Sequence, residues 1–118
     1  GFGIAIVISG RVVTGVEHAA GEIGRWPWAD AGELHDALSS PAVWRRLTGK
    51  SRRASLPADL HAALAALADQ RDEARTAIIT DYARVLASLQ LLLDSHSYFL
   101  HGPLTSLGPR FCEEISAS

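Results

Sequence analysis

Residues 1–26, GFGIAIVISGRVVTGVEHAAGEIGRW, decide the expected fold of this chain. Residues 4–8 are apolar at every position, which is typical of a strand that other elements cover on both faces. Ser9 and Gly10 follow as a two-residue turn, because glycine tolerates the positive φ that such turns require. Residues 11–14 then return as the partner strand. The chain is therefore predicted to begin with a β-hairpin.

Three glycines shape the segment after the hairpin. Gly15, Gly21 and Gly24 interrupt any regular periodicity over residues 15–28. Glycine lets a backbone turn tightly and lie close to a neighbour, and loops often carry binding residues. We therefore expect a loop here whose backbone makes a close approach.

Helical spacing dominates the middle of the chain. Ser40 before Pro41 is typical of a helix N-terminus, and Gly49 should end that helix before a basic loop over residues 50–55. Pro57 should open a second helix and Asp72 should cap a longer third one, and these two helices are expected to pack together. Their apolar positions at helical spacing are Leu60, Leu64 and Leu67 in the second helix, and Ile78, Tyr82, Val85, Leu89 and Leu92 in the third.

The last third of the chain is predicted to hold one strand and one helix. Residues 98–100 form a short apolar run that Gly102 and Pro103 break. Leu107, Phe111 and Ile115 are spaced by four, which predicts a final helix. The expected order is thus strand, strand, helices, strand and helix, an α/β arrangement.

Composition places the chain among soluble globular domains. Its 118 residues are 47% hydrophobic and 20% charged, with a net charge of -2, so one modest core is expected and nothing favours binding to a membrane surface or to nucleic acid. The apolar residues 85–93 are too few to cross a bilayer. Cys112 is the single cysteine, so no internal disulfide can form, and a cytoplasmic location is expected.

The first residues also predict that this is an internal piece of a longer protein. The sequence contains no methionine, and Gly1 already lies in what reads as the body of a strand. Apolar surface that the rest of such a protein would cover is expected to be exposed. We therefore expect a homo-oligomer.

Two stretches resemble the ROK family of bacterial repressors and sugar kinases. Residues 1–26 are similar to its signature region, in which a glycine-rich strand and a hairpin precede a loop ending Ala-Gly-Glu-x-Gly-His, matched here by residues 20–24. Residues 94–104, DSHSYFLHGPL, are similar to a later family segment, an apolar strand that ends in two glycines. The Ala/Leu-rich helical segment between them fits the family too, so the resemblance covers nearly the whole chain.

The resemblance implies a fold and a function. The fold would be α/β, part of an actin-like ATPase (ribonuclease H-like) domain over residues 1–118. The function would be the sugar-sensing region of a transcriptional repressor of carbohydrate metabolism, which would contact DNA only through an N-terminal domain outside this chain. Two alternatives stay open: part of an ATP-dependent sugar kinase, and a degenerate dimerisation module.

The family's cofactor and metal residues are only partly present. The phosphate loop and the catalytic aspartate would lie upstream of Gly1, so this chain alone is expected to show no sugar phosphorylation, and ATP is expected only if the parent is a kinase. Arg25 occupies the place of the family's zinc-binding histidine, and the cysteine-rich run is missing, so no zinc is expected. His101 replaces the first glycine of the later pair, where a side chain could obstruct the adenosine.

The candidate site residues follow from this resemblance. Glu22 would accept hydrogen bonds from adjacent sugar hydroxyls, with Gly21 shaping its loop; otherwise it is a solvated carboxylate. Arg25 can donate to a sugar or phosphate, although pointing to solvent or pairing with an acid is the commoner role. The cofactor candidates, through the family alone, are Gly1, Gly3 and Gly102.

Aromatic, basic and histidine residues suggest further sites, each with a simpler structural interpretation. Trp26, Trp28 and Trp44 can stack on a pyranose ring, although core packing is the commoner role. The basic cluster of Arg45, Arg46, Lys50, Arg52 and Arg53 can touch nucleic acid, but it lacks a helix-turn-helix pattern and a solvated loop is favoured. The histidines are too scattered to indicate a metal site; they are His18, His35, His61, His96 and His101.

Overall fold

The computed structural model describes residues 2–15, 19–28, 32–95 and 97–118. Within these residues the fold combines helices with two small antiparallel hairpins. In chain order the elements are β1 (Val7–Ile8), β2 (Arg11–Val12), the 3-10 helix η1 (Ile23–Arg25), β3 (Pro27–Trp28), β4 (Gly32–Glu33), α1 (Leu34–Leu38), α2 (Ser40–Thr48), α3 (Leu60–Ala65), α4 (Glu73–Leu93), the 3-10 helix η2 (Pro103–Leu107) and α5 (Pro109–Ala117).

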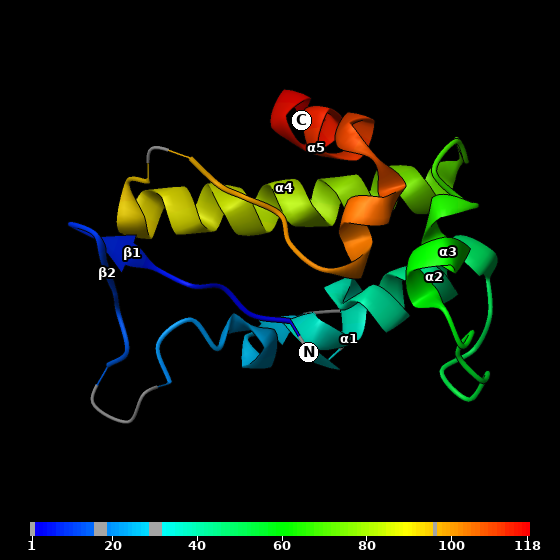
Figure 1. The fold of residues 1–118 in the computed structure, drawn as a ribbon, viewed down its shortest axis with the longest axis horizontal. Helices are drawn as coiled ribbons and strands as arrows, with labels where there is room; N and C mark the ends of the chain where they lie inside the picture. Colours follow the sequence, from blue (N-terminus) through cyan, green and yellow to red (C-terminus); the bar gives the residue numbers. More distant parts are fainter. Residues whose placement is uncertain (1, 16–18, 29–31, 96) are drawn as a thin grey trace.

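Helix α4 is the axis of the molecule. Figure 1 shows α4 running along the longest dimension, with α5 on one side, α1 on the other, and α2 and α3 near the end where α4 begins. The β1–β2 hairpin lies near the opposite end, where α4 finishes. The principal extents are 39 × 29 × 27 Å. The fold is thus a helical body with a hairpin at one end.

The hydrophobic core surrounds α4. Tyr82 is its central aromatic residue: the ring lies 5.9 Å from that of Phe2 and 5.7 Å from that of Phe111, and the hydroxyl donates a 2.7 Å hydrogen bond to the carbonyl oxygen of Leu38. Burial raises the pKa of this phenol, so it stays protonated and remains a donor. The largest fully buried side chains are Phe111, Leu34, Leu38, Leu64, Ile78, Leu107 and Val43.

The N-terminal hairpin is confirmed, but its first strand is short and uncovered. β1 pairs with β2 in the register Val7↔Val12 and Ile8↔Arg11, around the Ser9-Gly10 turn. Residues 2–6 are not part of the strand, although the Ile6 carbonyl oxygen accepts from the amide of Val13 at 2.8 Å. Val7 and Ile8 are 61% and 59% exposed. The prediction of a strand covered on both faces is therefore wrong, because the hairpin projects from one end of the molecule.

The helix boundaries follow capping side chains, and two differ from the sequence prediction. Ser39, one residue before the expected Ser40, accepts from the amide of Ala42 and caps α2, which Gly49 ends at φ +72°. The next helix begins after its cap Asp59 rather than at Pro57, because the Asp59 carboxylate accepts from the amide of Ala62 at 3.0 Å. Asp72 caps α4, as predicted.

Three further predictions about the second half are wrong. Residues 98–100 form no strand, because the described chain offers them no partner strand, and Phe99 is 91% exposed. Leu92 is 73% exposed rather than packed. Helix α3 packs mainly against η2 and α2, not against α4. The final helix is confirmed as α5, with Phe111 and Ile115 buried beside Leu107 of η2.

Helix α4 alone, in the described part of the chain, has the length and hydropathy that would permit a membrane span. One face of α4 carries the core residues. The first turn of α4 also carries the buried Arg75, whose Nε and Nη2 donate to the Glu114 carboxylate at 3.0 and 3.2 Å. That hydrogen bond lowers the pKa of Glu114. Among the described elements α4 packs against α1, α2 and α5.

Candidate functional site

The glycine-rich loop before η1 packs directly onto the N-terminal segment. The amide of Ile4 donates to the carbonyl oxygen of Gly21 at 2.9 Å. A Cβ on Gly21, which has φ +91°, would overlap the carbonyl oxygen of Ile4, and a Cβ on Gly24 would overlap that of Phe2. Both positions therefore require glycine, which confirms the predicted close approach of backbones.

This packing fixes the position of Glu22. Its amide donates to the Ala19 carbonyl oxygen at 3.2 Å, and its own carbonyl oxygen accepts from the amide of Arg25 at 3.3 Å, so the residue is held at the start of η1. Ile23 is half-buried and packs against the core, as expected for the residue that orients the loop. The Glu22 side chain is left exposed at the surface.

A shallow cavity of about 200 Å³ opens beside this loop. It joins Glu22 and Arg25 to two residues at the start of α1, Glu33 and His35, and its remaining lining is Phe2 and Gly24. Two carboxylates, an imidazole and a guanidinium thus face one small volume with an aromatic ring. These are acceptors and donors suited to hydroxyl groups.

Helix α1 supplies the far wall of the cavity. The Asp36 carboxylate accepts from the amide of Glu33 at 3.2 Å and so fixes the first turn. His35 lies between two acids, with Nε2 at 3.8 Å from Glu33 Oε2 and Nδ1 at 3.6 Å from Asp36 Oδ1. Glu33 Oε2 is shielded from solvent and has no hydrogen-bond donor in the described residues. A buried acceptor of this kind is rare and can be satisfied by a ligand or by water.

The structure brings the sugar-site candidates to one cavity, which the described cofactor candidates do not line. Glu22 and Arg25 line the cavity, and Gly21 positions Glu22. Gly3 lies against Gly21, while Gly102 starts η2 at φ +93°, and neither lines this cavity. Gly1 lies outside the described residues.

The tryptophans take structural positions. Trp44 is 8% exposed within the core, and Trp26 and Trp28 are half-buried against it. Core packing, the commoner role, is therefore the one observed. In the part of the chain that is described, no group of three His, Cys, Asp or Glu side chains could hold a metal ion, and His18 and His96 lie outside that part.

Sequence reasoning missed half of the cavity. Phe2, Glu33 and His35 belong to no motif, and in the sequence His35 is only one of five scattered histidines that indicate no metal site. Helix α1 and the β3–β4 hairpin before it, with Pro27↔Glu33 and Trp28↔Gly32 paired, bring Glu33 and His35 to the glycine loop. The one local signal was Gly32, whose φ of +87° allows the turn of the chain into α1.

Comparison with known proteins finds no relative of this chain. No protein-family model, no curated protein and no solved structure matches the chain. The resemblance to the ROK family therefore rests on the residues of this chain alone.

Proposed function

We propose that the cavity beside Glu22 binds a neutral sugar, and that this chain is the sugar-sensing region of a ROK-type transcriptional regulator. One observation carries the proposal: Glu22, the motif residue, shares a cavity with Glu33 and His35 on a loop whose shape two glycines impose. A transcriptional regulator must bind the sugar but need not convert it into a product. DNA contact would require a domain outside these residues.

The chemistry of the cavity supports a sugar. The carboxylates of Glu22 and Glu33 can each accept from two neighbouring hydroxyls, and His35 and Arg25 can donate to ring or hydroxyl oxygens. Phe2 offers an apolar surface for the C–H face of a sugar ring, and its contact with Tyr82 holds the ring in place. In the described residues no donor lies within hydrogen-bond distance of Glu33 Oε2, since His35 Nε2 is 3.8 Å away, and a sugar hydroxyl would satisfy this acceptor.

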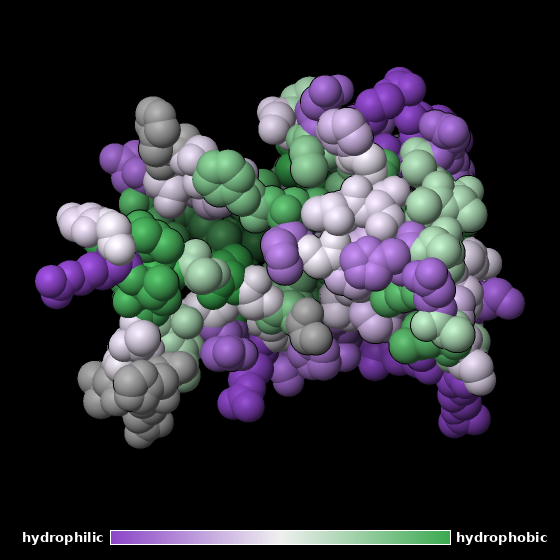
Figure 2. Space-filling view, in the orientation of Figure 1, coloured by the Kyte–Doolittle hydropathy of each residue, from purple (hydrophilic) through white to green (hydrophobic). Residues whose placement is uncertain are grey.

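An apolar end of the molecule favours a second candidate, the dimerisation module. Figure 2 shows hydrophobic residues gathered over the end that carries the β1–β2 hairpin, where the surface is also hollowed. The exposed apolar side chains include Leu91 and Phe99, 90% and 91% exposed. A homo-oligomer through this end is compatible with sugar binding at the cavity, so both roles can belong to one protein.

The test is calorimetric titration of this chain with hexoses, pentoses and N-acetylated sugars, in a reducing buffer that contains no zinc. Replacing Glu22 with Gln keeps the size of the side chain but removes the charge. We expect at least about tenfold weaker binding, because charge-assisted hydrogen bonds contribute roughly 1.5 to 3 kcal/mol. Glu113→Gln removes an equal charge at an exposed position of α5 and should leave affinity unchanged.

Thermal melts of each variant confirm that any change in affinity arises in a folded protein. Equal sugar affinity in the folded Glu22→Gln variant and the wild-type chain would show that the site is misplaced. Failure of every sugar to bind the wild-type chain would leave the dimerisation module as the better assignment.

A further inference from the structure

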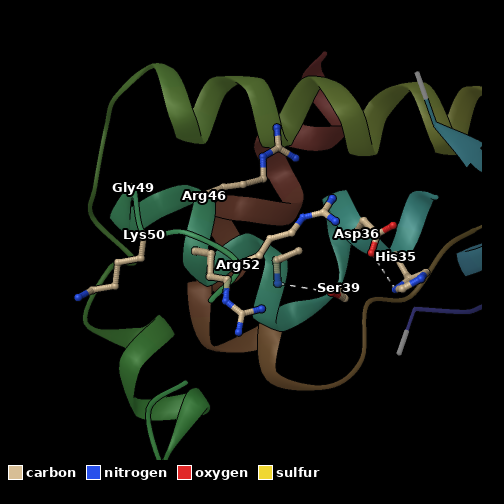
Figure 3. A pocket seen from close by; sticks show the side chains of 9 residues that line it. His35, Asp36, Ser39, Arg46, Gly49, Lys50 and Arg52 are labelled. Carbon is tan, nitrogen blue, oxygen red and sulfur yellow. Dashed lines mark hydrogen bonds and ion pairs between the residues drawn. The ribbon is translucent and has the colours of Figure 1, made fainter. Parts of the chain in front are cut away.

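A second cavity, larger than the first, runs along helix α2. Its volume is about 510 Å³, and its lining comes from α1, α2 and the loop after α2. The residues that face it on α2 are the cap Ser39, Ala42, Arg45, Arg46 and Gly49, which recur at the spacing of one helix face. Figure 3 shows His35 and Asp36 at one end of this cavity and Gly49 and Lys50 at the other.

The charge of this cavity is strongly asymmetric. Among the described residues that line it, four are cationic, namely Arg45, Arg46, Lys50 and Arg52, and one is a carboxylate, Asp36. Gly49 ends α2 at φ +72° and turns the chain so that Lys50 and Arg52 return beside the last helical turn. Cations near a helix C-terminus are favoured by the helix dipole, but that effect is worth only about 0.3–1 kcal/mol each and needs no cavity. The helix dipole therefore accounts for the basic character of this helix end, but not for the hollow that these side chains line.

Arg45 and Arg46 differ in their hydrogen-bond partners. Arg46 is committed to the fold: it donates to the Ala37 carbonyl oxygen at 3.0 Å and to the Asp81 carboxylate at 2.8 Å. Arg45 is half-buried and makes one hydrogen bond in the described chain, from Nη2 to the Ala54 carbonyl oxygen at 3.0 Å. No carboxylate pairs with it there, and its Nε is shielded from solvent without an acceptor.

Arg45 is positioned to bind an anion. Burying a guanidinium without a counter-charge is costly, and its planar set of five donors fits the oxygens of a phosphate group. The Ala54 bond holds one edge of the Arg45 guanidinium, so the group is already oriented. Ser39 is also suited to the site, because its Oγ accepts from Ala42 and leaves the hydroxyl hydrogen free to donate.

We infer that the cavity along α2 is a binding site for the phosphate group of a small ligand, with Arg45 as its principal donor. The solvated-loop interpretation of the basic cluster does not hold for Arg45 and Arg46, which are half-buried, whereas Lys50, Arg52 and Arg53 are exposed. Among the described lining residues the two cavities share His35 alone, so the phosphate site stands whether or not the Glu22 cavity binds sugar. A hollow centred on one arginine whose Nε is shielded from solvent favours a single phosphate group over a nucleic acid backbone, which would track an open surface stripe.

The test is a titration of this chain with inorganic phosphate, glucose 6-phosphate, glucose and a short single-stranded DNA, followed by amide chemical shifts. Both phosphates should bind and shift the amides of Ser39, Arg45 and Gly49. Arg45→Gln should weaken phosphate binding at least about tenfold, because a charge-assisted pair of bonds is lost. Arg45→Lys, which keeps the charge but loses the planar fork, should fall between the two.

The control is Arg84→Gln, which removes the same charge from an exposed position of α4 outside the cavity and should bind phosphate as the wild type does. If Arg45→Gln fails to fold, Arg52→Gln provides the second variant, since Arg52 is exposed and lines the same cavity. Equal weakening by Arg84→Gln, or DNA binding without phosphate binding, would overturn the inference. Glucose binding without phosphate binding would also overturn it while leaving the sugar proposal intact.

Discussion

Alanine at Gly21 provides the sharpest test of how the Glu22 loop is built. Two costs act at this position: the positive φ of +91°, and the overlap of the new Cβ with the carbonyl oxygen of Ile4. Gly10→Ala separates them, because Gly10 has φ +76° but open space around its missing Cβ. The difference between the two variants therefore isolates the overlap.

The magnitudes can be worked out from these two costs. A left-handed conformation costs an L-residue about 1–2 kcal/mol, which should be the whole effect of Gly10→Ala. Overlap with a packed backbone adds about 1–3 kcal/mol, so Gly21→Ala should cost roughly 2–5 kcal/mol or release the loop from the N-terminal segment. Release would also move Glu22 away from Glu33 and His35.

Two measurements follow the loop and the whole fold separately. Urea unfolding gives the free energy of unfolding of each variant, and hydrogen exchange of the Ile4 amide reports on its bond to the Gly21 carbonyl oxygen. We expect the Ile4 amide to lose protection in Gly21→Ala and to keep it in Gly10→Ala. If both variants lose the same free energy and Ile4 stays protected in both, the close-approach account is refuted.

Three other predictions concern the core and the apolar end. Glu114→Gln should lower the free energy of unfolding by about 1–2 kcal/mol at pH 7, because the buried Arg75 loses its charged acceptor. This figure already includes the weakening of the ion pair by solvent, since Glu114 is partly exposed. Since Arg75 lowers the pKa of Glu114, this contribution is present above the ordinary carboxyl pKa and is lost as pH falls through the folded value, so urea midpoints of variant and wild type should converge in acid. Tyr82→Phe should cost about 1–3 kcal/mol in thermal or urea unfolding, because it leaves the buried Leu38 carbonyl oxygen without its donor; an unchanged stability would show that water replaces the bond. The double variant Leu91→Ser, Phe99→Ser should reduce self-association in sedimentation velocity, and a wild-type chain that stays monomeric at high concentration would count against the apolar end as an interface.

The sequence could predict the elements that local chemistry controls. Asp72 caps α4 through its own side chain, and the Ser9-Gly10 turn closes the first hairpin through its own backbone. The close approach at Gly21 and Gly24 was also predictable, because only glycine can fill such positions.

The elements that depend on tertiary contacts could not be predicted. The apolar run at residues 98–100 has strand-like composition but no partner strand in the described chain. Helix α1 spans only five residues, too few for a periodic pattern, yet it brings His35 to the site. The cavity along α2 depends on how Gly49 returns the chain beside α2, and a list of basic residues does not contain that geometry.

The most direct test of the sugar proposal is an amide chemical-shift map of this chain with saturating sugar. The account predicts that a binding sugar shifts the amides of Glu22, Gly24, Glu33 and His35 together, because they line one cavity from two separate elements. The Glu22→Gln variant should need a much higher sugar concentration for the same shifts. Shifts confined to other parts of the molecule, or a shift map that Glu22→Gln leaves unchanged, would contradict the claim that this cavity senses a sugar.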